Sequence, residues 1–367
     1  LQSLAILSVS PPHWHCLLKG DNLERPEEVP AYWPSLAASL DAASDPHGTR
    51  VLELPGSDFA AHRWGNTVDP ILPGLMERGH VARELVPLGT PASASLVVAL
   101  DTEIQEGRFD SDSLAPLAHL MGVGEIVFRG DLQYERYRTP RPPDLWADLL
   151  AAEGLLPPTL YGEGLLNVAG PQRTLVDEHT LDRPSGAAVP PAAAVFGLAE
   201  ASTILRSADP TRPIVVAGDA EGLVAVAGEG FLEAGRPVFF SATLTDSPEV
   251  ANQAGALLLL TDSNRKRGQR WGTIRETQGY TERADEGPLA EDPTDQRLQA
   301  FPDLPGSQTV AFQEGVRASA TAYGNPVTFI PSARPFHAVD GDPLTAWSVS
   351  AFADARGEQL LLEFEEP

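Results

Sequence analysis

Apolar residues over positions 1–160 occur in short blocks whose spacing alternates between that of a helix and that of a strand. Residues 32–40 carry apolar side chains at helical spacing, and residues 50–54 form a compact apolar strand that a Pro-Gly pair ends. Two helical blocks follow at 93–107 and 111–124, and a second apolar strand follows at 124–132. This order of strand, helix, helix and strand predicts an α/β domain with some parallel pairing.

The clearest pattern lies in residues 211–265, which alternate strand, helix, strand, helix and strand. The first helix is expected over 220–235, with Asp219 as its N-cap and Gly235 at its end. The second helix is expected over 247–255. A β-α-β-α-β order implies right-handed crossovers and a parallel sheet, whose ligands lie beyond the carboxyl ends of the strands.

The chain is therefore predicted to be a mixed α/β protein of two α/β units with partly parallel sheets, followed by the first strands of a β-sandwich. The first domain is expected over 1–160, and the second over 161–310. A polar, Pro-rich linker closes the second domain, and short alternating strands begin after it. The third domain, over 311–367, is the expected start of the sandwich, with one strand near 359–364.

Composition limits the classes of function. The formal net charge is −25 over 367 residues, so the chain repels phosphate backbones and no nucleic-acid partner is expected. Its single cysteine, Cys16, leaves no internal disulfide, which does not settle the compartment. No run of 18 or more apolar residues occurs, so no transmembrane segment is expected in this piece of sequence.

Two acidic residues each follow a predicted parallel strand, and a cationic run follows the second. Asp219 and Asp262 are the acids, and Arg265, Lys266 and Arg267 begin the run. One interpretation is a carbohydrate or anion site that binds the phosphate of a lipid-linked or nucleotide-linked sugar. The other, which we favour on sequence alone, is a solvated helix start whose cations pair with nearby acids.

A second polar group follows the strand at 50–54. Asp58, His62, Arg63 and Trp64 combine a carboxylate, a cation and an aromatic ring, which could line a sugar site. A buried, hydrogen-bonded loop explains the same residues and is the interpretation that the sequence favours.

Motifs for hydrolytic chemistry are weak. The sequence contains no Gly-x-Ser-x-Gly nucleophile motif. A glycosidase needs two carboxylates on opposite sides of a sugar, and 51 acidic residues give chance candidates without singling out a pair. No catalytic residue is assigned, and a glycan hydrolase remains only an alternative.

Two long blocks carry a family resemblance. "RVLELPGSDFAAHRWGNTVDPILPGLMERGHVARELVPLGT" and "LLLLTDSNRKRGQRWGTIRETQGYTE" resemble the actinobacterial α-(1→3)-arabinofuranosyltransferases, the AftD-like family with the DUF3367 region. The resemblance covers nearly the whole chain. It implies a GT-C-like membrane glycosyltransferase of the cell envelope that takes arabinofuranose from a polyprenyl-phosphate donor. It also implies an extracytoplasmic part with carbohydrate-binding modules.

The same resemblance implies that the catalytic residue of the family lies outside this sequence. In GT-C enzymes the catalytic acid lies on an early extracytoplasmic loop between transmembrane helices, and this sequence shows no such helices. The chain therefore looks like a soluble segment of a membrane enzyme, and the resemblance transfers no catalytic residue to it.

The C-terminal stretch "RPFHAVDGDPLTAW" resembles the opening of the coagulation factor 5/8 type C, or discoidin, module. In related sugar-binding modules this turn often holds a structural calcium ion. The resemblance makes Asp340, Asp342 and Thr345 candidate calcium ligands through their oxygens. The alternative is a plain hydrogen-bonded Asp-Gly turn with Trp347 packed in the core. No other cofactor is expected.

These inferences combine into one functional expectation. The chain is interpreted as an extracytoplasmic segment of an arabinofuranosyltransferase that binds or positions cell-wall arabinan or arabinogalactan, with Trp64 or Trp271 in contact with the glycan. The polyprenyl-phosphate-linked sugar would be a partner only of the membrane domain. A non-catalytic scaffold that packs on that domain is the alternative of a different class.

Overall fold

The computed structural model describes most of the chain between Glu28 and Glu365. The described residues are 28–43, 48–57, 60–84, 90–133, 141–164, 189–244, 253, 255–265, 282–283, 298, 310–324, 333–343, 345–349 and 355–365. The chain divides into two compact units, one of residues 1–88 and 100–206 and one of residues 89–99 and 207–367. The domain boundaries expected near 160 and 310 stay predictions.

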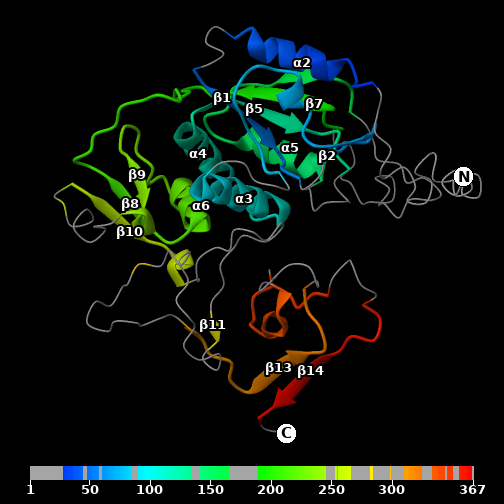
Figure 1. Ribbon diagram of the computed structural model, residues 1–367, viewed down its shortest axis with the longest axis vertical. Coiled ribbons are helices and arrows are strands. Elements are labelled where there is room, and N and C mark those ends of the chain that lie inside the picture. Colours follow the sequence, from blue (N-terminus) through cyan, green and yellow to red (C-terminus); the bar gives the residue numbers. More distant parts are fainter. Residues whose placement is uncertain are drawn as a thin grey trace, which may run out of the picture. The chain divides into compact units, whose positions relative to one another are not determined.

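A five-stranded sheet forms the centre of the first unit (Figure 1). Its order is β4 (His80–Val81), β1 (Arg50–Leu54), β5 (Val123–Arg129), β7 (Ala193–Gly197) and β6 (Thr159–Tyr161). β4, β1 and β5 are parallel, whereas β7 runs antiparallel to both β5 and β6. The expected mixed α/β class with partly parallel sheets is therefore confirmed, and β1 has the predicted bounds.

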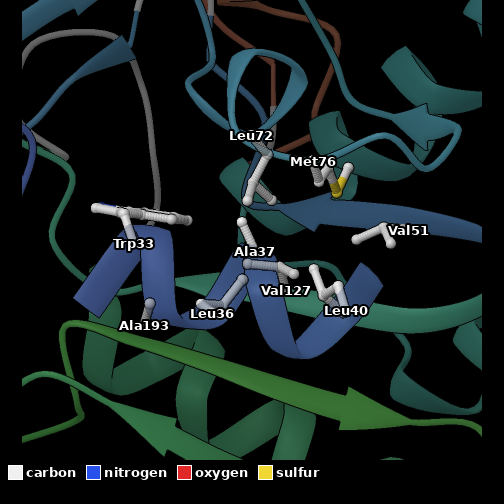
Figure 2. Packing of buried hydrophobic residues seen from close by; sticks show 9 residues of the cluster. All are labelled: Trp33, Leu36, Ala37, Leu40, Val51, Leu72, Met76, Val127 and Ala193. Atoms are coloured by element: carbon white, nitrogen blue, oxygen red, sulfur yellow. The ribbon is translucent and has the colours of Figure 1, made fainter. Parts of the chain in front are cut away.

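Helix α2 (Tyr32–Asp41) covers one face of this sheet, as the apolar spacing of its sequence predicted. Figure 2 shows Leu36 and Leu40 of α2 beside Val127 of β5, and Trp33 of α2 and Val51 of β1 belong to the same buried cluster. All five side chains are at most 3% exposed. Burial of a large apolar side chain contributes about 1.5–3 kcal/mol, so this helix–sheet layer is a main source of the unit's stability.

The opposite face of the sheet packs on α5 (Pro142–Ala151). Successive side chains of a strand point to opposite faces, so Phe128 of β5 points away from the face that Val127 shares with α2. The ring centroid of Trp146 lies 5.2 Å from that of Phe128 and 5.5 Å from that of Phe196 in β7. The sheet thus has a helix on each face, as parallel strands require.

The remaining elements before β5 are short, apart from two helices. They are β2 (Ala60–Ala61), β3 (Asn66–Val68), η3 (Leu72–Gly74), α3 (Pro91–Gln105), η4 (Ser111–Ser113) and α4 (Leu114–Met121). α3 contains the division between the two units. α4 ends at Gly122, which adopts a left-handed conformation with φ of +67°.

The second unit begins with a three-stranded parallel sheet of order β10 (Leu257–Leu260), β8 (Ile214–Ala217) and β9 (Val238–Phe240). Helix α6 (Ala220–Gly228) connects β8 to β9. The predicted parallel strands and the Asp219 N-cap are confirmed, but the predicted helix end at Gly235 is wrong. The helix stops at Gly228 because glycines weaken it there, and Gly230 takes φ of +74°. The second predicted helix lies almost wholly outside the described residues.

The C-terminal part contains an antiparallel pair, β13 (Val316–Ala320) with β14 (Leu360–Phe364), and the short helix η10 (Pro335–Ala338). β14 confirms the strand expected near the end of the sequence. The other short elements are η6 (Ser241–Thr243), η7 (Asp262–Arg265), β11 (Glu282–Arg283) and β12 (Val310–Ala311). A discoidin-like sandwich needs about seven strands, so that assignment stays a prediction. None of the helices in the described ranges is long and apolar enough to span a bilayer.

Candidate functional site

The candidate site lies at the carboxyl edge of the first sheet, where β1 and β5 end side by side. Ligands of open α/β sheets bind at this edge. After β1 the chain turns into β2, and after β5 it reaches Asp131 through Gly130. Two backbone bonds join these segments: Gln133 N–H donates to Ala61 O at 2.8 Å, and Arg63 N–H donates to Asp131 O at 2.7 Å. Residues 60–63 therefore lie along residues 131–133.

Asp131 is the centre of this edge, and its side chain is fully buried. Its Oδ2 accepts hydrogen bonds from Tyr32 Oη at 2.8 Å, Trp33 Nε1 at 2.9 Å and Trp64 Nε1 at 2.7 Å. Its Oδ1 lies 3.1 Å from Nδ1 of His62. One carboxylate thus connects the start of α2, the segment after β2 and the end of β5.

Electrostatics agree with an ionised Asp131. Burial alone would raise the pKa of this carboxyl, but the charge and hydrogen bond of His62 and the bonds from Trp64 and Tyr32 outweigh it and hold the pKa below its ordinary value. Burial, and then the charge of Asp131, raise the pKa of the Tyr32 hydroxyl, which therefore stays protonated and donates. The site at neutral pH is a carboxylate surrounded by donors.

The aromatic rings around Asp131 are packed against one another. The His62 ring stacks on Trp64, with centroids 4.6 Å apart and planes at 22°. Trp33 meets the His62 ring edge-on, with centroids 6.0 Å apart. Trp64 is partly exposed whereas His62 and Trp33 are buried, and Trp64 packs against the hydrophobic cluster while Asp131 holds its indole nitrogen.

A second buried ion pair joins the ends of β1 and β5. Arg129, the last residue of β5, directs Nε and Nη2 to the carbonyl oxygen of Pro55, and its Nη1 lies 3.5 Å from Glu53 Oε2. Glu53 is 1% exposed. Burial raises the pKa of Glu53, and the charge of Arg129 only partly opposes the rise.

The loop after β1 is fixed by a third buried acid. Asp101 Oδ1 accepts from Gly56 N–H at 2.6 Å, and Asp101 Oδ2 lies 2.9 Å from Arg83 Nη1. A side chain at position 56 would place its Cβ 2.5 Å from Cβ of Arg83, so only glycine fits this approach. The turn after β1 is therefore fixed by a hydrogen bond to Asp101 and by close packing against Arg83.

The structure brings together part of the group predicted from the sequence. Trp64 contributes its indole N–H, His62 its imidazole, and Arg63 its backbone N–H with a partly exposed side chain. Asp58 lies outside the described residues. The partner that organises the group, Asp131, was not identified from the sequence, although its place just beyond a predicted strand was a usable signal.

The second predicted group is found at the carboxyl edge of the other parallel sheet. Asp219 follows β8 and Asp262 follows β10, and these strands are neighbours. Asp219 Oδ1 caps α6 by accepting from Glu221 N–H at 3.1 Å, and Asp219 N–H donates to Ser263 Oγ at 3.0 Å. Its carboxylate therefore has a structural role there.

Most of the cations of this second group lie outside the described residues. Arg265 ends η7, and nothing is described of its side chain. Lys266, Arg267 and Trp271 lie outside the described residues. Asp262 is exposed at the start of η7. The predicted anion site there remains a prediction.

The predicted calcium turn forms a local network of hydrogen bonds. Asp340 Oδ1 accepts from Asp342 N–H at 3.1 Å, Asp340 Oδ2 lies 2.8 Å from Nδ1 of His337, and Thr345 Oγ1 lies 2.8–2.9 Å from both oxygens. Among the described residues no cluster of three His, Cys, Asp or Glu could hold a metal ion. The hydrogen bonds on Asp340 are those of a plain Asp-Gly turn, and the calcium site stays a prediction.

Comparison with known proteins shows the family to which the chain belongs. Residues 4–299 match the family model of the α-(1→3)-arabinofuranosyltransferase N-terminal GT-C domain, and the chain belongs to this family. It is 26% identical over 356 residues to the α-(1→3)-arabinofuranosyltransferase of Mycobacterium tuberculosis and 25% identical over 351 residues to that of Mycolicibacterium smegmatis. Each alignment covers 92% of this chain but 24% of the relative, so the chain spans about a quarter of their length.

A solved structure supports the fold. The cryo-EM structure of the arabinofuranosyltransferase AftD from mycobacteria matches 99% of this chain and 27% of its own, with a TM-score of 0.62 and 19% sequence identity. At this identity the likeness shows the arrangement of the backbone only.

Proposed function

We propose that this chain is an extracytoplasmic segment of a membrane arabinofuranosyltransferase of cell-wall arabinan synthesis, and that it binds or positions the growing glycan. In this proposal the catalytic centre, and the polyprenyl-phosphate-linked sugar, belong to parts of the enzyme outside the chain. The family match supports the assignment to arabinan synthesis, because its curated relatives are named for arabinofuranosyl transfer.

The observation that carries the glycan-binding role is the fixed aromatic ring at the carboxyl edge of the first sheet. Trp64 is partly exposed, yet its indole N–H is bound to Asp131 at 2.7 Å and its ring stacks on His62. A rigid aromatic ring loses little conformational entropy when an apolar sugar face packs on it. Arg63, next in sequence and partly exposed, supplies a donor for hydroxyl groups, and Asp58 is proposed as an acceptor.

A second contact is proposed at the carboxyl edge of the β10–β8–β9 sheet. There Asp262 and the cations Arg265, Lys266 and Arg267, with Trp271, would bind a charged or sugar group of the same glycan or of its carrier. Asp219 would act there only through the turn that it caps.

A binding measurement on the full chain tests the proposal. Calorimetric titration with arabinan and galactan oligosaccharides is expected to give binding that Trp64→Ala weakens at least tenfold. Tyr323→Ala, which removes a 42%-exposed aromatic ring in the other unit, is the matched control and is expected to leave binding unchanged. Equal binding by the wild type and a folded Trp64→Ala variant would contradict the proposed contact.

Two other functions predict different experimental outcomes. A structural scaffold would bind no glycan but would associate with the membrane domain of the enzyme in a pull-down. A glycan hydrolase would release reducing ends from arabinan. The buried state of Glu53, Asp101 and Asp131 argues against hydrolysis at this edge, because a glycosidase needs two carboxyl groups on either side of a sugar.

A further inference from the structure

Tyr32, the first residue of α2, is a second aromatic residue at the edge where Trp64 lies. Its hydroxyl donates to Oδ2 of Asp131 at 2.8 Å, and the indole N–H of Trp64 donates to the same oxygen at 2.7 Å. Two donor atoms on one oxygen cannot lie farther apart than these two bonds placed end to end. The polar ends of both rings therefore converge on one buried carboxylate oxygen, although the two residues belong to different segments.

Tyr32 also packs against a glycine, which fixes its ring further. A side chain at position 162, directly after β6, would place its Cβ 2.8 Å from Cδ1 of Tyr32 and 3.0 Å from Cβ of Ala192. Gly162 has φ of +69°, so its backbone conformation also disfavours other residues. The Trp64 ring is fixed by its stack on His62, with centroids 4.6 Å apart. Each ring thus has a fixed neighbour, and both residues remain partly exposed.

Both rings offer carbon surface to a ligand, because their donor hydrogens are already used. The Tyr32 O–H and the Trp64 N–H point to Asp131, so neither hydrogen is available to a sugar hydroxyl. The indole has no acceptor atom, and the Tyr32 oxygen can only accept a further bond. Aromatic carbon packs on apolar groups, and neither ring carries a charge. The part of a ligand that fits here is therefore uncharged, with C–H groups directed towards the rings.

We propose that Tyr32 and Trp64 together form a platform for an uncharged sugar residue of the glycan, and that Asp131 is the positioning residue that holds both rings. This inference rests on the proposed function of the edge. It adds a second contact residue, the group that orients both contacts and the chemical class of the bound part. Rings that are fixed before the ligand arrives lose little freedom on binding, so each contributes more of its contact to affinity.

Tyr161, in β6, provides the comparison that separates contact with the glycan from packing. It is partly exposed and packs on the same hydrophobic cluster as Tyr32 and Trp64. Its hydroxyl donates to Oγ of Ser39 at 2.6 Å, so a different partner holds it. Removal of the Tyr161 ring therefore costs packing of the same kind, but it leaves both bonds to Oδ2 of Asp131 in place.

Calorimetric titration of the full chain with a neutral arabinan oligosaccharide tests the platform. Tyr32→Ala is expected to weaken binding at least tenfold, and Tyr161→Ala to leave it unchanged. Tyr32→Phe keeps the ring but loses the bond to Asp131, so its affinity is expected between those of the wild type and Tyr32→Ala. Wild-type affinity in Tyr32→Ala, or an equal loss in Tyr161→Ala, overturns the platform. If Trp64→Ala still weakens binding, the proposed function survives that result, whereas a wild type that binds no glycan overturns both.

A measurement on the wild type decides the matter even if Tyr32→Ala fails to fold. Nuclear magnetic resonance of the aromatic carbons and of the Trp64 indole N–H follows both rings during titration with the same oligosaccharide. We expect the carbon signals of Tyr32 and Trp64 to shift together, while the indole hydrogen stays protected from exchange with water by its bond to Asp131. A shift of Trp64 alone, or loss of that protection, overturns the proposal.

The chemical class of the ligand has its own test. Inorganic phosphate, the charged group of a lipid-linked or nucleotide-linked sugar, is expected not to displace the oligosaccharide. Both rings are uncharged, and the carboxylate that holds them repels anions. Displacement by phosphate in the wild type would assign a charged ligand to these rings and overturn the assignment of an uncharged sugar.

Discussion

Replacing Asp131 by asparagine tests whether one carboxylate organises the edge of the first sheet. The carboxylate accepts bonds of 2.7–3.1 Å from Tyr32, Trp33, Trp64 and His62. The side-chain amide that Asp131→Asn introduces would retain one acceptor oxygen and turn an NH₂ group towards donors. Three of the four bonds end on Oδ2 and one on Oδ1, so the NH₂ group would face either His62 alone or the other three donors, and in both cases buried bonds to a charge are lost.

The magnitude follows from the kind of bond that is lost. A hydrogen bond to a charged group contributes about 1.5–3 kcal/mol, but bonds that share one acceptor do not add. Breaking a buried charge pair by removing one partner costs about 3–5 kcal/mol. We therefore expect Asp131→Asn to lower the free energy of unfolding by about 3–5 kcal/mol, a large share of the roughly 5–15 kcal/mol of a whole domain.

Urea unfolding at pH 7, followed by tryptophan fluorescence and far-ultraviolet circular dichroism, measures this change. Fluorescence reports the surroundings of Trp33 and Trp64, and circular dichroism reports the helices. Asp69→Asn is the matched control, because Asp69 is exposed and close in sequence to Trp64. A loss below about 1 kcal/mol for Asp131→Asn, equal to that of the control, would refute the central role of this carboxylate.

Three further outcomes follow from the structure. Gly222→Ala would bring a Cβ within 2.2 Å of the Thr261 hydroxyl oxygen, so overpacking should lower the stability of the second unit by about 1–3 kcal/mol in thermal unfolding. The stabilisation that comes from the lowered pKa of Asp131 is fully present above its ordinary pKa of 3.8 and is lost progressively as the pH falls from there through the folded value. Circular dichroism between pH 2 and pH 5 should therefore show acid unfolding of the wild type in that range and unfolding at higher pH in the less stable Asp131→Asn. Calcium should give little calorimetric heat, since the hydrogen bonds on Asp340 compete with the ion, and strong binding would instead establish the calcium site.

Local sequence signals were sufficient for much of the fold. A dense apolar block ended by proline indicated β1, and helical apolar spacing indicated α2, because both depend on neighbours in the sequence. The end of α6 was placed too late, at Gly235 in place of Gly228. Glycines inside an apolar helical pattern are ambiguous, and only the chain's return to β9 decides which of them ends the helix.

The candidate site was harder to predict because its parts are distant in sequence. Trp64 and Arg63 were selected from their own segment, but the residue that holds them is 67 positions away from Trp64. Asp131 is one of 51 acidic residues, and its selection needs the pairing of β1 with β5. Glu53 was hidden for another reason, since a charged residue inside an apolar strand gives no sign of whether it is buried.

The attachment of α2 to Asp131 has a consequence for the order in which the protein assembles during synthesis. α2 begins without a side-chain cap, and Tyr32 and Trp33 at its start are fixed by a residue 99 and 98 positions later. While the ribosome is still making the first strands, this helix has no polar anchor and few partners for its apolar face. The first unit should therefore fold cooperatively only after β5 has left the ribosome. A nascent chain stalled before Asp131 should remain sensitive to protease.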